Sequence, residues 1–329
     1  MTTDLVVLHE HPEWQLPLFS ALSKRGVRFT PFDLKAACFD VDMVPEAKLY
    51  FNQASPSAYV RGNTGAVPLA LSLIRALEIA GARVLNGSSA FTMELSKSAQ
   101  GATLKKLGLA HPRSLAFNDV AVAARRWPRW PCLLKPEQGG SGARMFRLES
   151  PEELLRTFQQ TPGLWEPGGL FLLQELFPVD PERGIVRMEF LGGELLYAMR
   201  VVSHGAFNLC PSEVCNPSDG AEGACQIPDR PAARPVEFFP YPEVPARAVL
   251  AGEAIARACS LDVCGIEYLE APDGRLVYFD INANSNLRLA IASSFGFDPF
   301  ERVVDFLERE LRRAGGRGAP EARSTRDVA

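Results

Sequence analysis

A pair of strand-like segments joined by Asp273-Gly274 constrains this chain more than any other feature of its sequence. An Asp-Gly pair between runs rich in β-branched and aromatic residues is a strong signal for a two-residue hairpin turn. Here it separates residues 264–269 from residues 276–282. With Asp273 and Gly274 as the loop, the register of the hairpin places Glu267 directly opposite Asp280.

Alternation of side chains along these two segments predicts one polar and one apolar face. The polar face carries Glu267, Asp280 and Asn282. The apolar face comprises Val277, Phe279, Ile281, Ile266 and Tyr268. Like charges directly opposite each other destabilise a sheet, so the two carboxylates require a cation. Oxygen ligands of this kind favour a hard ion, Mg²⁺ before Ca²⁺ or Mn²⁺, although a solvent-exposed hairpin would carry the same residues.

The size and composition of the chain indicate a globular protein with more than one domain. Its 329 residues exceed the length at which single hydrophobic cores stop growing. With 22% charged residues, a net charge of −4 and no dense block of Lys and Arg, we expect no nucleic-acid partner. No apolar run is long enough to span a membrane, and the N-terminal residues lack a signal-peptide pattern. We therefore expect a cytoplasmic protein without a membrane partner, with its seven cysteines as free thiols, and a homodimer as the default oligomer.

Residues 1–95 alternate short apolar runs with amphipathic helical segments, as expected of a small parallel α/β domain. The strand-like runs are residues 5–8, 27–29, 48–51 and 83–85, and the helical segments are residues 16–22 and 67–80. Loops after such strands often carry ligand contacts, which makes residues 9–11 and 52–55 candidates for substrate contact. Ordinary polar turns are the simpler explanation of both loops.

A glycine-rich loop follows a predicted strand over residues 131–136, after a predicted helix over residues 96–107. The loop contains Gly139, Gly140, Ser141 and Gly142. Glycines let a backbone approach a ligand closely and point its amides at phosphate oxygens. Lys135 precedes the glycines, so the loop is not a Walker A motif. A mobile flap or a plain hairpin turn would use the same glycines.

A second hairpin is predicted around Gly192-Gly193, with Arg200 opposite Ile185. This register places Arg187 and Arg200 on one face of the sheet. The opposite, apolar face would comprise Val186, Met188, Phe190, Leu195, Tyr197 and Met199. Two arginines on a polar sheet face are suited to phosphate or carboxylate, because each can form a bidentate pair. An exposed charged face would have the same pattern.

The remaining segments complete the outline of the chain. Residues 211–245 are rich in proline and lack periodicity, which predicts a long functional loop. Helices are expected over residues 245–259 and 299–312, and residues 314–329 are expected to form a disordered tail. Soft-metal ligands cluster only at His204, Cys210, Cys215 and Cys225, and their spacing matches no zinc pattern.

The order of these features resembles the ATP-grasp superfamily, in particular its RimK-like and glutathione-synthetase-like carboxylate–amine ligases. The resemblance covers about residues 1–312, and its specific points are Lys97 after the strand end at Asn86, Lys135-Pro136 with the glycine loop, the segment from Gln174 to Phe177, the two arginines and the acidic hairpin. It implies a mixed α/β and α+β architecture, the ATP-grasp fold. A parallel α/β domain over residues 1–95 would precede a small lobe over residues 96–172 and a C-terminal lobe over residues 173–313. The antiparallel sheets of the two lobes would enclose a nucleotide.

The same resemblance implies ATP and Mg²⁺ as cofactors, with Mn²⁺ as an alternative metal. Residues that would bind the nucleotide are Lys97, Lys135, Gly139, Gly140, Ser141, Gly142, Gln174, Glu175, Leu176, Phe177 and Asp180. The transferring phosphoryl group would be held by Arg187, Arg200 and Asn208, and the metal by Glu267, Asp280 and Asn282. The chain departs from the family in two places. Ser96 replaces an acidic residue before the lysine, and Glu267 and Asp280 reverse the usual order of the two acids, an exchange that can keep the gap between the carboxylates.

The activity implied by the resemblance is an ATP-dependent ligase that forms an amide or peptide bond through an acyl phosphate and releases ADP and phosphate. Its partners would be a small-molecule or peptide carboxylate and an amine, with an amino acid as the expected amine. Asn52, Ser55, Arg61 and the proline-rich loop would shape the acceptor site. Two alternatives are a nucleotide-binding protein of the same architecture without ligase activity and an ATP-dependent phosphoryl transferase.

Overall fold

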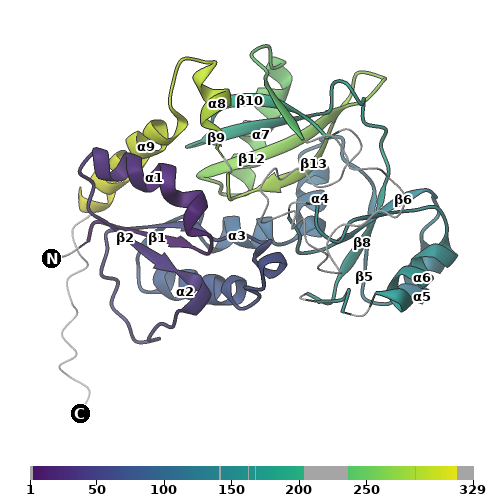
Figure 1. The fold of residues 1–329 in the computed structure, drawn as a ribbon, viewed down its shortest axis with the longest axis horizontal. Coiled ribbons are helices and arrows are strands. Elements are labelled where there is room, and N and C mark those ends of the chain that lie inside the picture. The colour runs from purple at the N-terminus through teal and green to yellow at the C-terminus, as the bar shows by residue number, and fades with distance from the viewer. Residues whose placement is uncertain are drawn as a thin grey trace.

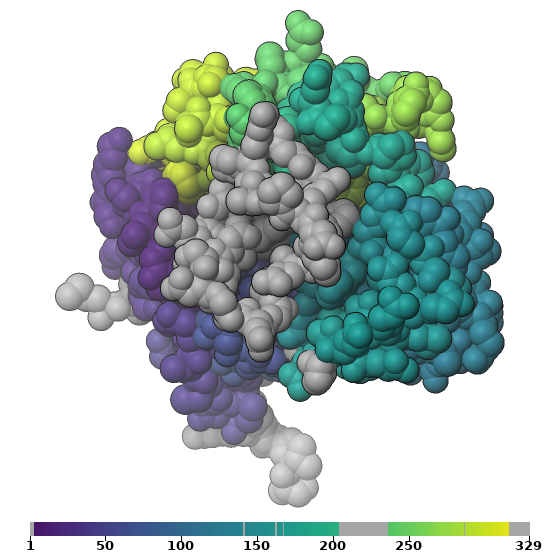
Figure 2. All heavy atoms as spheres, turned by 45° about the vertical axis from the view of Figure 1, so that its right-hand side comes forward, coloured from purple at the N-terminus to yellow at the C-terminus, as the bar shows by residue number. Residues whose placement is uncertain are grey.

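The computed structural model describes residues 3–140, 142–161, 163–166, 168–203, 236–285 and 287–316. These residues form a mixed α/β structure built on three sheets (Figure 1). In Figure 2 the N-terminal strands and helices, in purple, lie beside the C-terminal helix, in yellow, while the small lobe, in teal, lies on the other side of the molecule. Among the helices of the described ranges, none has both the length and the apolarity needed to cross a bilayer.

The N-terminal domain is a parallel four-stranded sheet with strand order β2-β1-β3-β4. Its elements are β1 (Leu5–His9), α1 (Pro12–Lys24), β2 (Phe29–Asp33), β3 (Leu49–Gln53), α2 (Ala66–Ile79) and β4 (Arg83–Leu85), with short 3₁₀ turns at Leu34–Ala36 and Ala58–Arg61. The predicted strand over residues 27–29 was placed too early, because β2 starts at Phe29 and continues through Pro31. Proline is tolerated there since β2 is an edge strand.

The small lobe has an antiparallel sheet with strand order β5-β8-β6-β7. Its elements are α4 (Lys97–Lys106), β5 (Ser114–Phe117), α5 (Val120–Arg126), β6 (Cys132–Pro136), β7 (Phe146–Leu148), α6 (Pro151–Gln160) and β8 (Phe171–Glu175). The preceding helix α3 (Ser88–Glu94) contributes Phe91 to the core of the N-terminal domain. An aromatic cluster of Phe117, Phe158, Trp165 and Phe171 fills the core between this sheet and α6. This core holds β6, which carries Lys135, in a fixed position.

The C-terminal lobe has a five-stranded sheet with strand order β11-β10-β9-β12-β13. Its elements are β9 (Ile185–Leu191), β10 (Glu194–Val202), β11 (Glu237–Pro240), α7 (Ala246–Ala258), β12 (Val263–Glu270), β13 (Leu276–Asn282), α8 (Leu289–Ser293) and α9 (Pro299–Gly316). Two expectations need correction. Strand β11 lies within the segment expected to be a loop, and α9 continues to Gly316, so residues 314–316 are helical instead of belonging to a tail.

Some predicted features lie outside the described residues. These are Ser141 of the glycine loop, Asn208, the cluster of His204, Cys210, Cys215 and Cys225, residues 211–235 of the proline-rich loop and residues 317–329 of the tail.

The predicted register of the acidic hairpin is confirmed at the polar residues and wrong at the turn. Glu267 pairs with Asp280, as expected. Near the turn, however, Ala271 N donates to Arg275 O at 2.9 Å, so the loop comprises residues 272–274. A bulge at Phe279 then restores the expected pairing. Because of this bulge, Tyr278 packs in the apolar core and Phe279 faces the cavity described below.

The predicted register of the second hairpin is wrong beyond its first two pairs. Leu196 is an extra residue in β10, so Arg200 pairs with Val186 and Met199 pairs with Arg187. Arg187 and Arg200 therefore point to opposite faces, and Tyr197 and Met199 leave the apolar face predicted for them. Both faces of the sheet are covered by apolar clusters, so no polar alternation marks the register in the sequence.

Asn86 joins the N-terminal domain to the C-terminal lobe. It follows β4 with a left-handed φ of 49°, a conformation that asparagine tolerates better than most residues. Its side chain is fully buried, and its amide nitrogen donates to Val263 O at 2.9 Å and to Ala283 O. Its amide oxygen accepts from the backbone nitrogens of Asp262 and Val263 at 2.9 and 3.2 Å. These bonds attach the end of β4 to both strands of the acidic hairpin.

Replacing Asn86 with alanine should destabilise the protein by about 3 kcal/mol, because buried backbone groups of β12 lose their partners and alanine is strained at positive φ. Chemical unfolding would measure the free-energy change. The matched control is Asn118→Ala at an exposed position, which should change stability by less than about 0.5 kcal/mol. Equal stabilities of the two variants would show that Asn86 does not join the domains.

Candidate active site

One cavity of about 1020 Å³ lies where the N-terminal domain, the small lobe and the C-terminal lobe meet. The small lobe contributes Lys97 from α4 and Lys135 from β6, and the C-terminal lobe contributes residues of β9, β12 and β13. The predicted site residues that line it are Lys97, Lys135, Gly139, Gly140, Gly142, Gln174, Glu175, Leu176, Phe177, Asp180, Arg187, Glu267, Asp280 and Asn282. The fold thus brings together segments that are far apart in the sequence.

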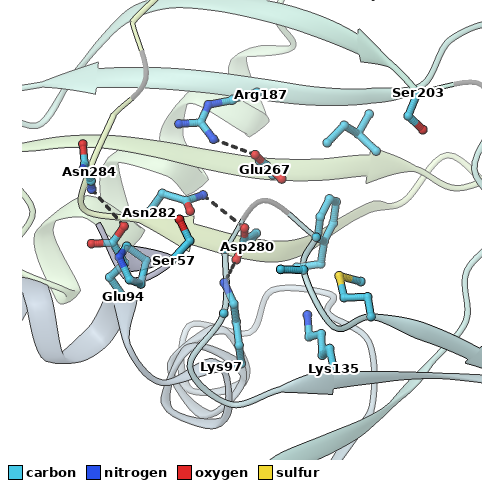
Figure 3. Close-up of a pocket in the computed structure, with 18 of the residues that line it drawn as sticks. Ser57, Glu94, Lys97, Lys135, Arg187, Ser203, Glu267, Asp280, Asn282 and Asn284 are labelled. Atoms are coloured by element: carbon cyan, nitrogen blue, oxygen red, sulfur yellow. Dashed lines mark hydrogen bonds and ion pairs between the residues drawn. The ribbon is translucent and has the colours of Figure 1, made fainter. Parts of the chain in front are cut away.

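A row of alternating charges crosses the centre of this cavity (Figure 3). Glu267 lies on β12 between Arg187 on β9 and Asp280 on β13. Arg187 donates from Nη1 to Glu267 at 2.8 Å, and the ammonium of Lys97 forms an ion pair with Asp280. Asn282 completes the polar group, donating its amide to Asp280 Oδ2 at 3.3 Å. The charge that two facing carboxylates require comes from one arginine and one lysine.

The environment separates the pKa values of the two carboxyl groups. Burial raises the pKa of Glu267, and the nearby guanidinium of Arg187 only partly opposes this effect. Burial also acts to raise the pKa of Asp280, but the ammonium groups of Lys97 and Lys135 hold that pKa below its usual value. Asp280 is therefore charged at neutral pH. Burial opposes charge on Arg187 as well, but Glu189 and Glu267 outweigh it and raise the pKa of the guanidinium.

Gly265 leaves the space that Arg187 occupies. Gly265 pairs with Glu189 on one side and with Asn282 on the other, and a Cβ at this position would clash with the guanidinium of Arg187. Arg187 also donates from Nε to Glu189 at 2.6 Å, and the Glu189 side chain is fully buried. The guanidinium is thus fixed over β12 at the wall of the cavity.

Lys135 is a buried cation without a direct ion pair among the residues that the structure describes. Its side chain is only 6% exposed and makes no hydrogen bond or ion pair with any residue that the structure describes. Burial, and then repulsion from Lys97, lowers the pKa of its ammonium to about 8, although the charges of Asp280 and Glu267 act in the opposite direction. A buried, unpaired ammonium is unfavourable unless an anion binds beside it. This arrangement fits a polyphosphate.

The glycine loop packs against the N-terminal domain. A Cβ at Gly140 would come within 3.1 Å of the Ser57 side chain, and Gln138 donates to Pro56 O at 3.4 Å. Gly142 has a φ of 70°, a backbone conformation that residues with a side chain rarely adopt. The described residues of the loop therefore contact residues 56–57 at the wall of the cavity.

The segment at the end of β8 forms another part of the cavity wall. Gln174 donates to Ser114 Oγ at 3.0 Å, and Glu175 pairs with Arg129 at 2.8 Å. Leu176 and Phe177 add apolar surface, together with Leu133 of β6. Asp180 accepts hydrogen bonds from the backbone nitrogens of Glu182 and Arg183, which lower the pKa of its carboxyl group. A ligand with a flat apolar ring and polar edge atoms fits this part of the cavity wall.

Several candidates do not line the cavity. Arg200 pairs with Glu270 at 3.0 Å and lies over the ring of Tyr241, on the opposite face of the sheet from Arg187. Arg61 is held by Glu10 at 2.5 Å, beside the cavity but not in its wall. Residues 9–11 and Asn52 are also absent from the wall, whereas Gln53 and Ser55 belong to it.

The structure adds residues that the sequence did not indicate. Glu94, at the end of α3, accepts a hydrogen bond from Asn284 N at 3.2 Å and lines the cavity together with Asn284 and Ser285. No short motif surrounds Glu94, so spacing alone could not identify it.

Within the described ranges, no group of three or more His, Cys, Asp or Glu residues could hold a metal ion. The hairpin offers two carboxylates and an amide.

A search against models of known protein families found no match, and a search of curated protein sequences found none either. Solved structures do match the fold. The ATP-grasp ligase PsnB complexed with a minimal precursor superposes with a TM-score of 0.64 at 19% sequence identity, over 94% of this chain and 100% of that chain.

Two further structures match over similar lengths. The VanG D-Ala:D-Ser ligase from Enterococcus faecalis has a TM-score of 0.69 at 13% identity, over 94% of this chain and 100% of that chain. A RimK-domain ATP-grasp protein from Sphaerobacter thermophilus has a TM-score of 0.65 at 14% identity, over 92% of this chain and 99% of that chain. Because these matches cover 92–94% of this chain and 99–100% of the matched chains, the protein has the ATP-grasp fold, as the order of its motifs predicted.

Proposed function

We propose that the protein is an ATP-dependent ligase that joins a carboxylate to an amine through an acyl phosphate. One observation carries this proposal. Among the described residues, Lys135 lies buried and makes no direct ion pair, in the same cavity as the charge row of Arg187, Glu267, Asp280 and Lys97. A magnesium nucleotide matches both features, since its phosphates would satisfy Lys135 and its metal would satisfy the carboxylates.

The chemistry follows from the weakness of a carboxylate as an electrophile. Transfer of the γ-phosphoryl group of ATP to the carboxylate gives an acyl phosphate, and an amine can attack its carbonyl carbon, forming the C–N bond and releasing phosphate. Such a transfer needs alignment and charge neutralisation more than covalent help from the protein. When bound, Mg²⁺ supplies positive charge at the phosphate oxygens, and Glu267, Asp280 and Asn282 are the residues that would hold it.

The other predicted site residues that line the cavity have the following roles in this proposal. Lys97 and Lys135 neutralise the phosphates, and Arg187 stabilises the negative charge that develops during transfer and attack. The segment from Gln174 to Phe177 would hold the adenine, and Asp180 or Glu182 would bind the ribose; of these two acids, Asp180 lines the cavity. The glycine loop excludes water, which would otherwise hydrolyse the acyl phosphate. Arg200 has no role here because its side chain lies on the other face of the sheet.

The structural neighbours support the same class of substrates. PsnB is described as a ligase complexed with a precursor and VanG as a D-Ala:D-Ser ligase. A peptide or an amino acid is therefore a reasonable partner for this chain. Mn²⁺ could replace Mg²⁺ at oxygen ligands of this kind.

Measuring ADP release with panels of carboxylates, each with and without amines, separates the proposed ligase from its two alternatives. A ligase releases ADP at a high rate only when both partners are present. Release with a carboxylate alone, and accumulation of a stable phosphorylated product, would identify a phosphoryl transferase. Nucleotide binding without release under any combination would identify a binding protein.

Replacing Asp280 with asparagine should raise the Mg²⁺ concentration needed for half-maximal binding of AMPPNP at least about tenfold, because the site loses one of its two anionic ligands. The Mg²⁺ titration can use a fluorescent AMPPNP analogue. Asp273→Asn is the matched control, since Asp273 lies exposed at the turn of the same hairpin. An unchanged titration in Asp280→Asn would remove this residue from the metal site.

The affinity for AMPPNP with Mg²⁺ should fall about tenfold per pH unit above pH 8. Only the protonated ammonium of Lys135 attracts phosphate, and its pKa in the free protein is about 8. Binding favours the protonated form, so the protein should take up a proton when the nucleotide binds at pH 8–9. Calorimetry in buffers of different ionisation enthalpy measures this uptake. In Lys135→Arg, which stays charged, the decline should disappear; a persistent decline would mean that another group titrates.

A further inference from the structure

Glu94 is a buried carboxyl group with one unsatisfied oxygen at the wall of the cavity. Its side chain is 2% exposed. Asn284 N donates a hydrogen bond to Oε1 at 3.2 Å, whereas Oε2 has no hydrogen-bond partner among the described residues. Burial raises the pKa of this carboxyl group to about 8. The nearby cations are already paired, Lys97 with Asp280 and Arg187 with Glu189 and Glu267. At neutral pH the free carboxyl group is therefore mostly protonated, and a ligand cation beside Oε2 would favour its ionised form and form a charge-assisted hydrogen bond with it.

Glu94 lies at the end of the cavity remote from Lys135. In Figure 3, Glu94, Asn284 and Ser57 lie on one side of Asp280 and Lys97, and Lys135 lies on the other side. A nucleotide held by Lys135, with its metal at Asp280, would therefore direct its transferring end toward Glu94. The space next to Glu94 is therefore the part of the cavity that lies beside the transferring phosphoryl group.

Part of the cavity wall is apolar. It is formed by residues of the N-terminal domain, β12 and the C-terminal part of the chain, namely Leu18, Phe51, Val263, Leu287, Phe300 and Val303. All six belong to one hydrophobic cluster that packs α9 and α1 against the N-terminal sheet. We refer to these six residues as the apolar wall. Leu18, Phe51, Val263 and Val303 are at most 4% exposed, so Leu287 and Phe300, which are partly exposed, are the members that could cover an apolar group of a ligand.

One short segment connects Glu94 with the apolar wall. Asn284 bonds to Glu94 through its backbone nitrogen and donates its side-chain amide to Gln53 O at 3.0 Å. Gln53 ends the strand that carries Phe51, and Leu287 follows Asn284 closely in the sequence. The carboxyl group and the apolar wall are thus parts of one subsite.

We infer that this subsite binds the acceptor amine and that the acceptor is a primary amine with an apolar side chain. The amino group donates to Glu94 Oε2, and the side chain packs against the apolar wall. This inference rests on the proposed ligase function, because it assigns the nucleophile of that reaction. A charge-assisted hydrogen bond and the burial of a side chain of leucine size each account for roughly a tenfold gain in affinity or more.

Three small amides test the two contacts separately in protein saturated with AMPPNP and Mg²⁺. Leucinamide carries the amino group and the apolar side chain, glycinamide lacks the side chain, and 4-methylpentanamide lacks the amino group. Ligand-observed NMR titrations measure the three dissociation constants. Leucinamide should bind at least about tenfold more tightly than either of the other two. Equal binding of leucinamide and glycinamide, or of leucinamide and 4-methylpentanamide, would overturn the inference.

Variants assign the contacts to residues. Glu94→Gln should weaken leucinamide at least about fivefold and leave 4-methylpentanamide unchanged, because only the amine uses the carboxylate. Leu287→Gln should weaken leucinamide and leave glycinamide unchanged. Leu289→Gln is the matched control, since Leu289 is 48% exposed and lies outside the cavity wall. Loss of leucinamide binding in Leu289→Gln, or none in the other two variants, would contradict the assignment.

Nucleotide binding, measured in the same samples, distinguishes failure of the inference from failure of the proposed function. If AMPPNP binds and the three amides do not differ, the proposed function stands and the amine subsite is wrong. If AMPPNP does not bind to the unmodified protein, the proposed function itself is wrong. Thermal unfolding identifies any variant that fails to fold, and in that case the comparison of the three amides in the unmodified protein decides the question.

Discussion

The candidate site depends on two acidic side chains of neighbouring strands, Glu267 and Asp280. Each forms an ion pair with one cation. Burying a carboxylate costs several kcal/mol unless an opposite charge and hydrogen bonds accompany it. Glu267 obtains its charge from Arg187 within the same sheet, but Asp280 depends on Lys97 from the first turn of α4. This ion pair adds to the contacts that Gln100 makes with the backbone of Ile281 and that Leu104 makes with the core of the C-terminal lobe. The cavity lies beside this junction.

The same row of charges suits the proposed reaction. A divalent ion at the two carboxylates would replace the charge that Lys97 and Arg187 provide, leaving both side chains able to bind phosphate oxygens. Binding of metal and nucleotide would then be coupled through one set of charges. Lys135 differs from both residues, because it forms no ion pair with a described carboxylate that a metal would have to replace.

The sequence predicted the parts of the molecule that have a periodic or turn signal. Strand β4 and the pairing of Glu267 with Asp280 are as expected, the latter because the bulge at Phe279 compensates for the longer turn. The placement of Arg200 failed, because Leu195–Met199 is apolar on both faces and gives no sign of the extra residue in β10. Glu94 was not found, since its significance depends on burial and on the missing partner of one oxygen. A sequence contains neither property directly.

A crystal structure with AMPPNP and Mn²⁺ would test the central claim most directly, because anomalous scattering locates the metal without assumptions about its ligands. We expect the metal signal between Glu267, Asp280 and Asn282, with a phosphate oxygen within hydrogen-bond distance of Lys135. A nucleotide bound elsewhere, or a metal with no oxygen ligand from the acidic hairpin, would contradict the account.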